Sequence, residues 1–123
     1  MPNLQIIHER WILTAAHCLD GIVRIEVFLG AINRYTDGRP GSPVEFHIVT
    51  NRRSIIMHPG YNTNTNANDI ALVELPRDAQ TTHNYIATIR LPTGADLTRN
   101  LVTEVGTVSG FGRKIQMFRN IFE

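Results

Sequence analysis

The sequence is poor in the residues that form covalent cross-links and carry nucleophilic hydroxyl groups. Its 123 residues contain one cysteine and three serines. A single cysteine excludes an intramolecular disulfide. The formal net charge is only +1, and basic residues form no run longer than a pair such as Arg52-Arg53. We therefore predict neither a nucleic-acid partner nor an anionic membrane partner.

Long apolar segments are also missing. No stretch approaches the roughly 20 residues needed to cross a bilayer. Residues 1–10 have neither the basic start nor the long apolar core of a signal peptide. We predict no membrane span and no export signal in the chain as written. With 42% hydrophobic and 19% charged residues, the chain suits one modest core and is too short for two comfortable domains.

The apolar residues that are present follow strand patterns, and no segment has convincing helical periodicity. In the segment 22–29, the odd-numbered side chains from Val23 to Leu29 share one face. In the segment 44–58, Phe46 and Ile48 are apolar positions of an alternating pattern, and a polar break predicts one bent strand or two collinear strands. The predicted strands are 11–14, 22–29, 44–58 and 70–75.

A histidine ends the first apolar run. Residues 11–18 read Trp-Ile-Leu-Thr-Ala-Ala-His-Cys, so a buried strand breaks at two small residues and presents His17. An imidazole with a pKa of roughly 6.5 can take and return a proton near neutral pH. For catalysis it needs a carboxylate that fixes its tautomer and a nucleophile that it serves. Taken alone, such a histidine is more often structural.

A carboxylate stands at the head of the last predicted strand. Residues 68–75 read Asn-Asp-Ile-Ala-Leu-Val-Glu-Leu, and the asparagine-rich segment 62–68 predicts a loop that delivers Asp69. Taken alone, this aspartate is more often a turn residue. Asp69 follows His17 by 52 positions, a separation that suits two neighbouring strands. We predict that the carboxylate lies near Nδ1 of the imidazole.

The two motifs together resemble the trypsin-like serine proteases of the chymotrypsin fold. Thr-Ala-Ala-His-Cys at 14–18 and Asp-Ile-Ala-Leu at 69–72 match that family's histidine and aspartate signatures in the right order. Val-Ser-Gly-Phe-Gly at 108–112 is similar to the strand that opens the family's second barrel, with Phe111 where tryptophan is usual. The resemblance covers about residues 6–113. It implies an all-β, antiparallel chymotrypsin-like β-barrel, the first of two barrels and incomplete at both ends.

The resemblance also implies how the chain is divided. Residues 1–123 would form a partial trypsin-like peptidase domain. About 6–76 would be the first barrel, 77–103 the inter-barrel connection, 104–113 the first strand of a missing second barrel, and 114–123 an unrelated tail. Residues 1–5 and 114–123 depart from the family pattern, which we interpret as an incomplete gene model or a truncated product. Open barrel edges then predict self-association.

The function implied by the resemblance is serine-type endopeptidase activity on protein or peptide substrates, in an extracellular setting. His17 would be the general base and acid, and Asp69 the carboxylate that orients it. The family's nucleophile lies in a Gly-Asp-Ser-Gly-Gly loop, which this sequence lacks together with the oxyanion hole and specificity pocket. We interpret Ser42, Ser54 and Ser109 as structural, and predict that this chain is inactive by itself. The alternative is a noncatalytic protease homologue that binds proteins through its barrel surface.

The resembled family has a disulfide at the position of Cys18 and, in several members, a calcium-binding loop. In the resembled family this cysteine pairs with one upstream, near the place that Pro2 holds here. We interpret the Cys18 side chain as a small buried hydrophobe rather than a reactive thiol. The loop at 30–44 holds calcium in several family members, but Asp37 and Glu45 offer too few carboxylate oxygens. We predict no metal site and no cofactor.

Overall fold

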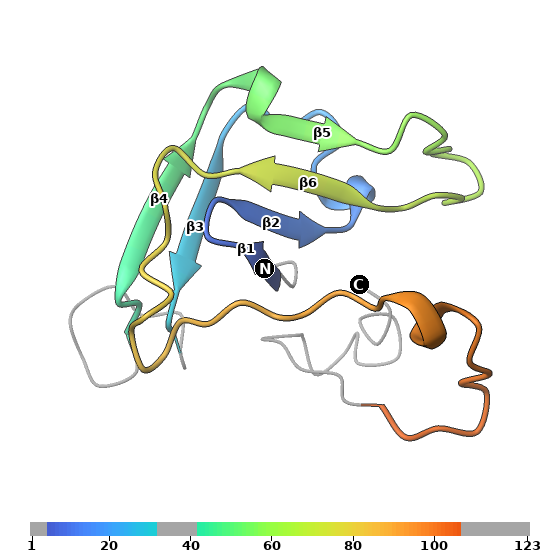
Figure 1. Cartoon of the computed structure of the whole chain (residues 1–123). Helices are drawn as coiled ribbons and strands as arrows, with labels where there is room; N and C mark the ends of the chain where they lie inside the picture. The colour runs from blue at the N-terminus through green and yellow to red at the C-terminus, as the bar shows by residue number, and fades with distance from the viewer. Residues whose placement is uncertain (1–4, 32–41, 107–123) are drawn as a thin grey trace.

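The structure is a computed structural model that describes residues 5–31 and 42–106. Within those ranges it contains six β-strands and three short 3-10 helices (Figure 1). No helix among these residues is long and apolar enough to cross a membrane. The helices are η1 (Ala16–Cys18), η2 (Arg52–Ser54) and η3 (Gly94–Leu97). The strands are β1 (Gln5–His8), β2 (Trp11–Thr14), β3 (Ile25–Leu29), β4 (Glu45–Val49), β5 (Ile55–Met57) and β6 (Ala71–Glu74).

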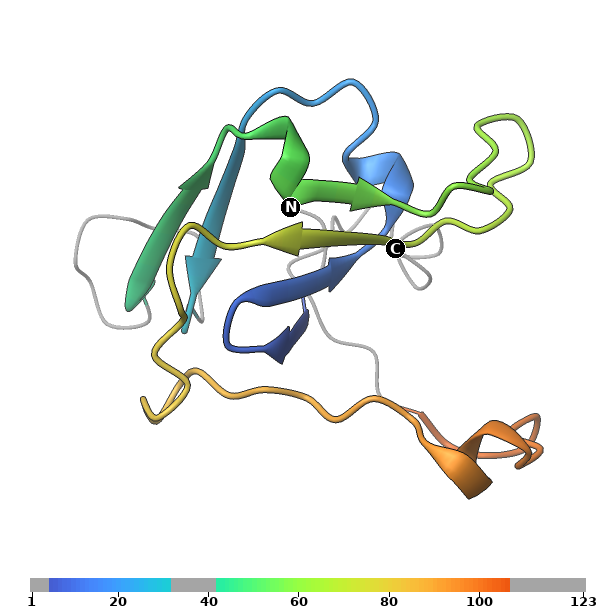
Figure 2. The ribbon, with the colours of Figure 1, turned by 45° about the horizontal axis from the view of Figure 1, so that its top comes forward.

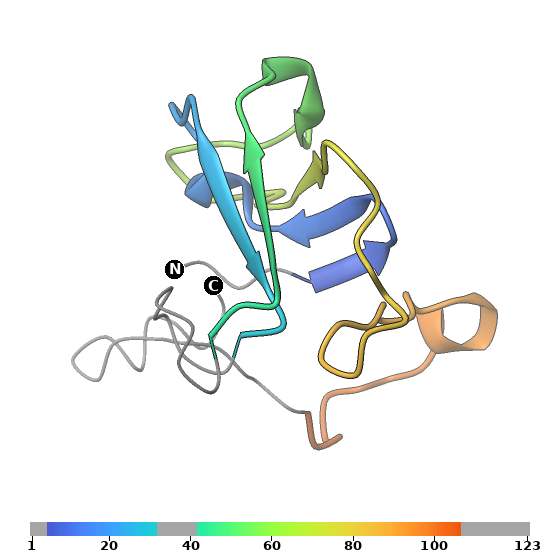
Figure 3. The same cartoon turned by 90° about the vertical axis from the view of Figure 1, so that its left-hand side faces the viewer.

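The strands build two antiparallel sheets, so the predicted all-β, antiparallel class is confirmed. One sheet has the order β1-β2-β6-β5, and β3 pairs with β4 in the other. Figures 1 and 3 show the two-stranded sheet standing across one end of the four-stranded sheet. At the centre of the larger sheet, β2 pairs with β6, with Trp11 opposite Glu74 and Thr14 opposite Ala71. This pairing fixes which ends of the two strands lie together.

Both sheets contribute to one hydrophobic core. Ile12 on β2 and Val27 on β3 have no exposed surface, and Val73 on β6 is 1% exposed. Alternation along β2 and β6 directs every second side chain inward, as expected for strands with one buried face. The buried hydrophobic residues are Ile12, Ala16, Leu19, Val27, Leu29, Val49, Ala71, Val73, Leu75, Ala79 and Ile86.

The second predicted strand is shorter than the sequence pattern indicates. β3 begins at Ile25, so the prediction of a strand over 22–29 is wrong for its first three residues. Gly21 has a φ of +72°, and the Ile22 N–H donates to the Leu19 carbonyl oxygen at 3.1 Å. This turn takes Val23 away from the core, and its side chain is 71% exposed.

The predicted strand over 44–58 divides between the two sheets. β4 belongs to the two-stranded sheet and β5 to the four-stranded sheet, so the expectation of one bent strand or two collinear strands is wrong. The turn of η2 separates them, and the Asn51 side chain caps it by accepting a hydrogen bond from the Arg53 N–H at 3.0 Å.

The inward and outward faces of β4 differ from what hydropathy suggests. Phe46 and Ile48 are 41% and 40% exposed, whereas Glu45 and His47 are buried at 8% and 0%. A buried charge requires a partner, and Glu45 Oε1 lies 2.5 Å from His47 Nε2 while Oε2 accepts the Gln80 N–H at 2.9 Å. Burial raises the pKa of Glu45, but these hydrogen bonds and the nearby positive charges outweigh it and hold that pKa below its ordinary value.

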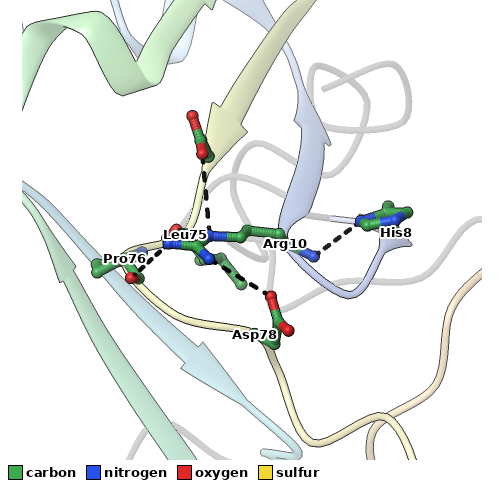
Figure 4. Close-up of polar contacts among 6 residues, drawn as sticks. His8, Arg10, Leu75, Pro76 and Asp78 are labelled. Atoms are coloured by element: carbon green, nitrogen blue, oxygen red, sulfur yellow. Dashed lines mark hydrogen bonds and ion pairs between the residues drawn. The ribbon is translucent and has the colours of Figure 1, made fainter.

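Arg10 fixes the end of the β2–β6 pair that lies away from η1 (Figure 4). Its guanidinium donates to the carbonyl oxygens of Leu75 (3.1 Å) and Pro76 (2.9 Å), and ion pairs join it to Glu74 (3.9 Å) and Asp78 (3.7 Å). The Leu75 N–H donates to the Arg10 carbonyl oxygen at 2.8 Å. These contacts extend the register beyond the last strand residues.

The segment after Pro76 returns along the sheet. The Ala79 N–H donates to Glu9 O at 2.6 Å and the Ile89 N–H to Ile6 O at 2.8 Å, so this connection lies beside β1. The division at 76 and 103 remains a prediction. A strand was expected at 104–113, but residues 104–106 are not part of a sheet. Residues 107–113 lie outside the described residues, and so do Pro2 and the tail at 114–123.

Candidate active site

The pairing of β2 with β6 places His17 and Asp69 at the same end of the sheet. Thr14 and Ala71 face each other, and His17 follows Thr14 by three positions while Asp69 precedes Ala71 by two. After β2, Ala15 is still extended, and the buried Ala16 begins the turn of η1, which carries His17. Figure 2 shows η1 and the 58–70 segment at this end. Two distant motifs therefore meet because their strands are neighbours.

The His17–Asp69 contact has two hydrogen bonds. Asp69 Oδ2 lies 2.6 Å from His17 Nδ1, and Asp69 Oδ1 accepts the backbone N–H of His17 at 2.7 Å. Because an ionised carboxylate can only accept, Nδ1 carries the proton, and Nε2 keeps its lone pair in the neutral ring. The predicted contact between the carboxylate and Nδ1 is confirmed. Both side chains are partly buried, with 31% of His17 and 24% of Asp69 exposed.

The environment keeps Asp69 ionised. Burial raises the pKa of its carboxyl group, but hydrogen bonds from the His17 ring, the His17 N–H and the Ala16 N–H, with the His17 charge, outweigh burial. The pKa of Asp69 therefore lies below its ordinary value. An acceptor that stays charged can hold the ring in one tautomer and stabilise the imidazolium that forms when the ring takes a proton.

Acid should weaken the folded state through this carboxylate. In the unfolded chain the pKa of this carboxyl group is about 3.9, and in the folded chain it is lower. The carboxylate therefore stabilises the fold above about pH 3.9, and this stability is lost as the pH falls through the folded-state pKa. We expect the urea concentration at the unfolding midpoint to decrease as the pH drops below about 4. Asp69→Asn should make this decrease smaller. Urea unfolding at several pH values measures both.

The urea experiment has a matched control variant and a second carboxylate that contributes to the same decrease. Asp78→Asn is the matched control because its carboxylate is 62% exposed and lies at the Arg10 end of the sheet. Glu45, whose pKa is also lowered, contributes in the same direction, so the decrease should shrink without disappearing in Asp69→Asn. An unchanged pH profile in Asp69→Asn would contradict the assignment.

The asparagine-rich loop holds the backbone just before Asp69. Asn68 and Asn66 have φ values of +57° and +56°, in the left-handed region that asparagine tolerates better than most residues. The Asn68 side chain donates to the Gly60 carbonyl oxygen at 3.0 Å. The Asn62 side chain accepts the Asn64 N–H at 2.8 Å. The predicted loop is confirmed, and its asparagines bond their own backbone as expected.

Sequence reasoning misjudged Cys18 and overlooked Tyr61. Cys18 is only half-buried, so its interpretation as a small buried hydrophobe is wrong. Its Sγ lies 3.4 Å from His17 Nε2. Tyr61 follows the His58-Pro-Gly turn and packs against the core. Burial, followed by the charges of Asp69, Asp20 and Cys18, raises the pKa of its hydroxyl. The adjacency of His17 and Cys18 in the sequence was the available signal for the contact between their side chains.

The serines and metal candidates can be placed only in part. Ser54 directly precedes β5, whose first residue lies opposite Val73, so it sits toward the Glu74 end of β6 rather than the Asp69 end. The Ser42 hydroxyl is buried without a hydrogen-bond partner in the described structure. Ser109 and Asp37 lie outside the described residues. No group of three or more potential metal ligands occurs in 5–31 and 42–106.

The family model for trypsin matches residues 5–120. The chain belongs to the trypsin family. Among similar proteins, collagenase of Hypoderma lineatum is 38% identical over 72 residues, which cover 58% of this chain and 24% of the collagenase. CLIP domain-containing serine protease B9 of Anopheles gambiae is 32% identical over 128 residues, covering 94% of this chain and 31% of that protease.

A solved structure of HL collagenase is also similar to this chain. The TM-score is 0.65 at 32% sequence identity, and the match covers 78% of this chain and 37% of that one. The chymotrypsin-like fold predicted from the two motifs is therefore confirmed. The chain spans about a quarter to a third of the two relatives described above. Serine proteases of this family act on protein or peptide substrates.

Proposed function

We propose that this chain carries the proton-transfer pair of a serine endopeptidase. His17 is the general base and acid, and Asp69 is the carboxylate that orients it. The observation that carries the proposal is the Asp69 contact, in which one oxygen lies 2.6 Å from Nδ1 and the other holds the backbone of the same histidine at 2.7 Å. Such a bidentate contact fixes both the position and the tautomer of the ring.

The chemistry follows from the orientation of the ring. With its proton on Nδ1, the imidazole offers the Nε2 lone pair to a serine hydroxyl that attacks a peptide carbonyl. The proton moves to Nε2, and the ionised Asp69 stabilises the imidazolium. The ring then gives this proton to the leaving amine as the acyl-serine forms. Water repeats the cycle in reverse and releases the acid product.

The nucleophile is the part of this proposal that the 123 residues do not supply. They contain no Gly-Asp-Ser-Gly-Gly segment, and Ser54 lies toward the opposite end of β6. We therefore propose that the pair works only with a segment that brings the serine, the oxyanion hole and the specificity pocket. The greater length of the trypsin-family relatives supports this view. The extracellular location also remains a prediction from the family.

Labelling with a fluorophosphonate probe tests the proposal directly. The purified 123-residue chain should take up no probe, because neither an activated serine nor an oxyanion hole is available. Sequencing the transcript on both sides of these codons should find a Gly-Asp-Ser-Gly-Gly coding segment, and the product containing it should be labelled and should cleave casein. Labelling of Ser42, Ser54 or Ser109 that is lost in the alanine variant would contradict the assignment.

The noncatalytic binding module remains the alternative. The His17–Asp69 geometry favours the protease, because a surface that only docks proteins has no need of a carboxylate aligned on Nδ1 at 2.6 Å. A product that includes the serine segment, is folded, and neither binds the probe nor cleaves casein would favour the binding module instead.

A further inference from the structure

We propose that Asn68 is a positioning residue that holds Asp69 in line with His17. Two features carry the proposal, the left-handed backbone of Asn68 and its side-chain hydrogen bond to the carbonyl oxygen of Gly60. The proposal rests on the proposed roles of His17 and Asp69. The alignment of these two residues can nevertheless be measured in the 123-residue chain without any catalysis.

The backbone on both sides of Asp69 is fixed by a tight turn. Asn68 has a φ of +57°, and its carbonyl oxygen accepts the Ile70 N–H at 2.8 Å. Residues 68–70 therefore form a three-residue turn with Asp69 at its centre. The Ile70 carbonyl oxygen in turn accepts the His58 N–H at 3.0 Å, which attaches the turn to the residue after β5. The direction in which the Asp69 side chain leaves the backbone thus depends on the conformation of Asn68.

The side chain of Asn68 ties this turn to the opposite end of the loop between β5 and β6, which Figure 1 shows beyond the ends of both strands. Its Nδ2 donates to the Gly60 carbonyl oxygen at 3.0 Å, and the Gly60 N–H donates to His58 Nδ1 at 2.9 Å. Between these points the loop closes on itself, because the Asn62 N–H donates to the Ala67 carbonyl oxygen at 3.1 Å. The Asn68–Gly60 contact therefore bridges the base of a closed loop and separates the tip of that loop from the catalytic carboxylate.

Gly60 is needed at this contact for its small size. It is not one of the glycines with a positive φ, so its backbone conformation also suits alanine. A Cβ at this position would lie 2.9 Å from Nδ2 of Asn68 and 3.3 Å from Cε1 and Nδ1 of His58. Non-bonded heavy atoms prefer separations of about 3.5–4.0 Å, so the added methyl group would push the Asn68 amide away. Gly60→Ala therefore breaks the same contact without changing Asn68.

Three variants separate the side-chain contact from the backbone conformation. Asn68→Gly removes the contact but keeps the left-handed region accessible. Asn68→Ala removes the contact and also disfavours that region, because a Cβ penalises a positive φ. Gly60→Ala displaces the amide and leaves the backbone of Asn68 as it is. All three should loosen the contact of Asp69 with His17, and Asn68→Ala should loosen it most.

NMR of the 123-residue chain measures this loosening. Exchange of the His17 amide proton reports on the contact with Asp69 Oδ1, and the ring nitrogen shifts report on the tautomer that Oδ2 selects. We expect the amide proton to exchange about two- to tenfold faster in Asn68→Gly and in Gly60→Ala, the size expected when one hydrogen bond is lost. A second tautomer should appear beside the ring protonated on Nδ1. The double variant should show no more than the larger single effect, because both changes break one contact.

Asn64→Ala is the matched control and should behave like the wild-type chain. Asn64 is exposed in the same loop, and within the described part of the chain it forms a hydrogen bond only through its backbone N–H. Unchanged amide exchange and an unchanged tautomer in the folded Asn68 and Gly60 variants would overturn the proposal. Loss of the fold in all of them would overturn it as well, since Asn68 would then support the whole fold rather than the position of Asp69.

Kinetics and stability separate positioning from a purely structural role. In the proposed serine protease, Asn68→Gly should lower kcat about two- to tenfold with KM nearly unchanged. Urea unfolding should change little, because Asn68 is exposed. A protease that fails to cleave peptides even with Asn68 in place would contradict the proposed function, whereas the NMR comparison would still decide the role of Asn68.

Discussion

In the serine protease proposed above, replacing Asp69 with asparagine is expected to lower peptide hydrolysis about 10⁴-fold, a magnitude carried over from characterised serine proteases. The structure indicates why. The His17 backbone N–H needs an oxygen acceptor at the Oδ1 position. The amide oxygen therefore occupies that position and the NH₂ group faces Nδ1. Because NH₂ can only donate, the ring proton moves to Nε2, where it blocks acceptance from a nucleophile.

Steady-state kinetics and ring nitrogen shifts measure this effect separately. The loss should fall on kcat, with KM nearly unchanged, because the tautomer affects the transition state rather than substrate binding. Nitrogen NMR of the 123-residue chain should show His17 protonated on Nδ1 in the wild type and on Nε2 in Asp69→Asn. Asp78→Asn should alter neither quantity. Activity within tenfold of the wild type in Asp69→Asn would show that Asp69 does not orient the ring.

Truncating Ile12 should have the largest effect on folding. Ile12 has no exposed surface and faces Val73 in the central strand pair. Ile12→Ala leaves a cavity that the surrounding strands fill only in part, and such changes cost about 2–5 kcal/mol. That is a large fraction of the roughly 5–15 kcal/mol that stabilises a typical domain. Urea unfolding followed by circular dichroism, at several chain concentrations, gives the difference.

The control for that measurement lies on the same sheet. Ile56 on β5 is 47% exposed, and surface substitutions of this kind change stability by about 0.5 kcal/mol or less. Equal losses in Ile12→Ala and Ile56→Ala would mean that the sheet does not bury Ile12 as described. A midpoint that rises with chain concentration would reveal the self-association that we predict from open strand edges.

The sequence was most informative where one residue pattern has one structural outcome. The run from Trp11 to Thr14 became a strand with the predicted limits, and the two motifs led to the His17–Asp69 contact. Predictions failed where the outcome depends on a partner. Hydropathy alone cannot place His47 inside, because its ring pairs with the carboxylate of Glu45, which in turn accepts a backbone N–H from the distant Gln80.

The position of the Cys18 sulfur could not be read from sequence for a related reason. Adjacent residues in an extended strand point in opposite directions, whereas the tight turn of η1 brings the side chains of neighbours together. Sequence identifies the neighbours but not the local turn that decides whether they touch. The length of β3 has the same origin, since the turn at Gly21 continues past the start of the alternating pattern.

The register between β2 and β6 also bears on how such a chain can change during evolution. Thr14 faces Ala71 through the pairing of β2 with β6, so we expect insertions and deletions between these strands to leave the spacing of His17 and Asp69 unchanged. Changes of one residue inside either strand are different, because they reverse which side chains face inward. Loop lengths can therefore drift among descendants of this sequence, while the four-residue lengths of β2 and β6 are constrained.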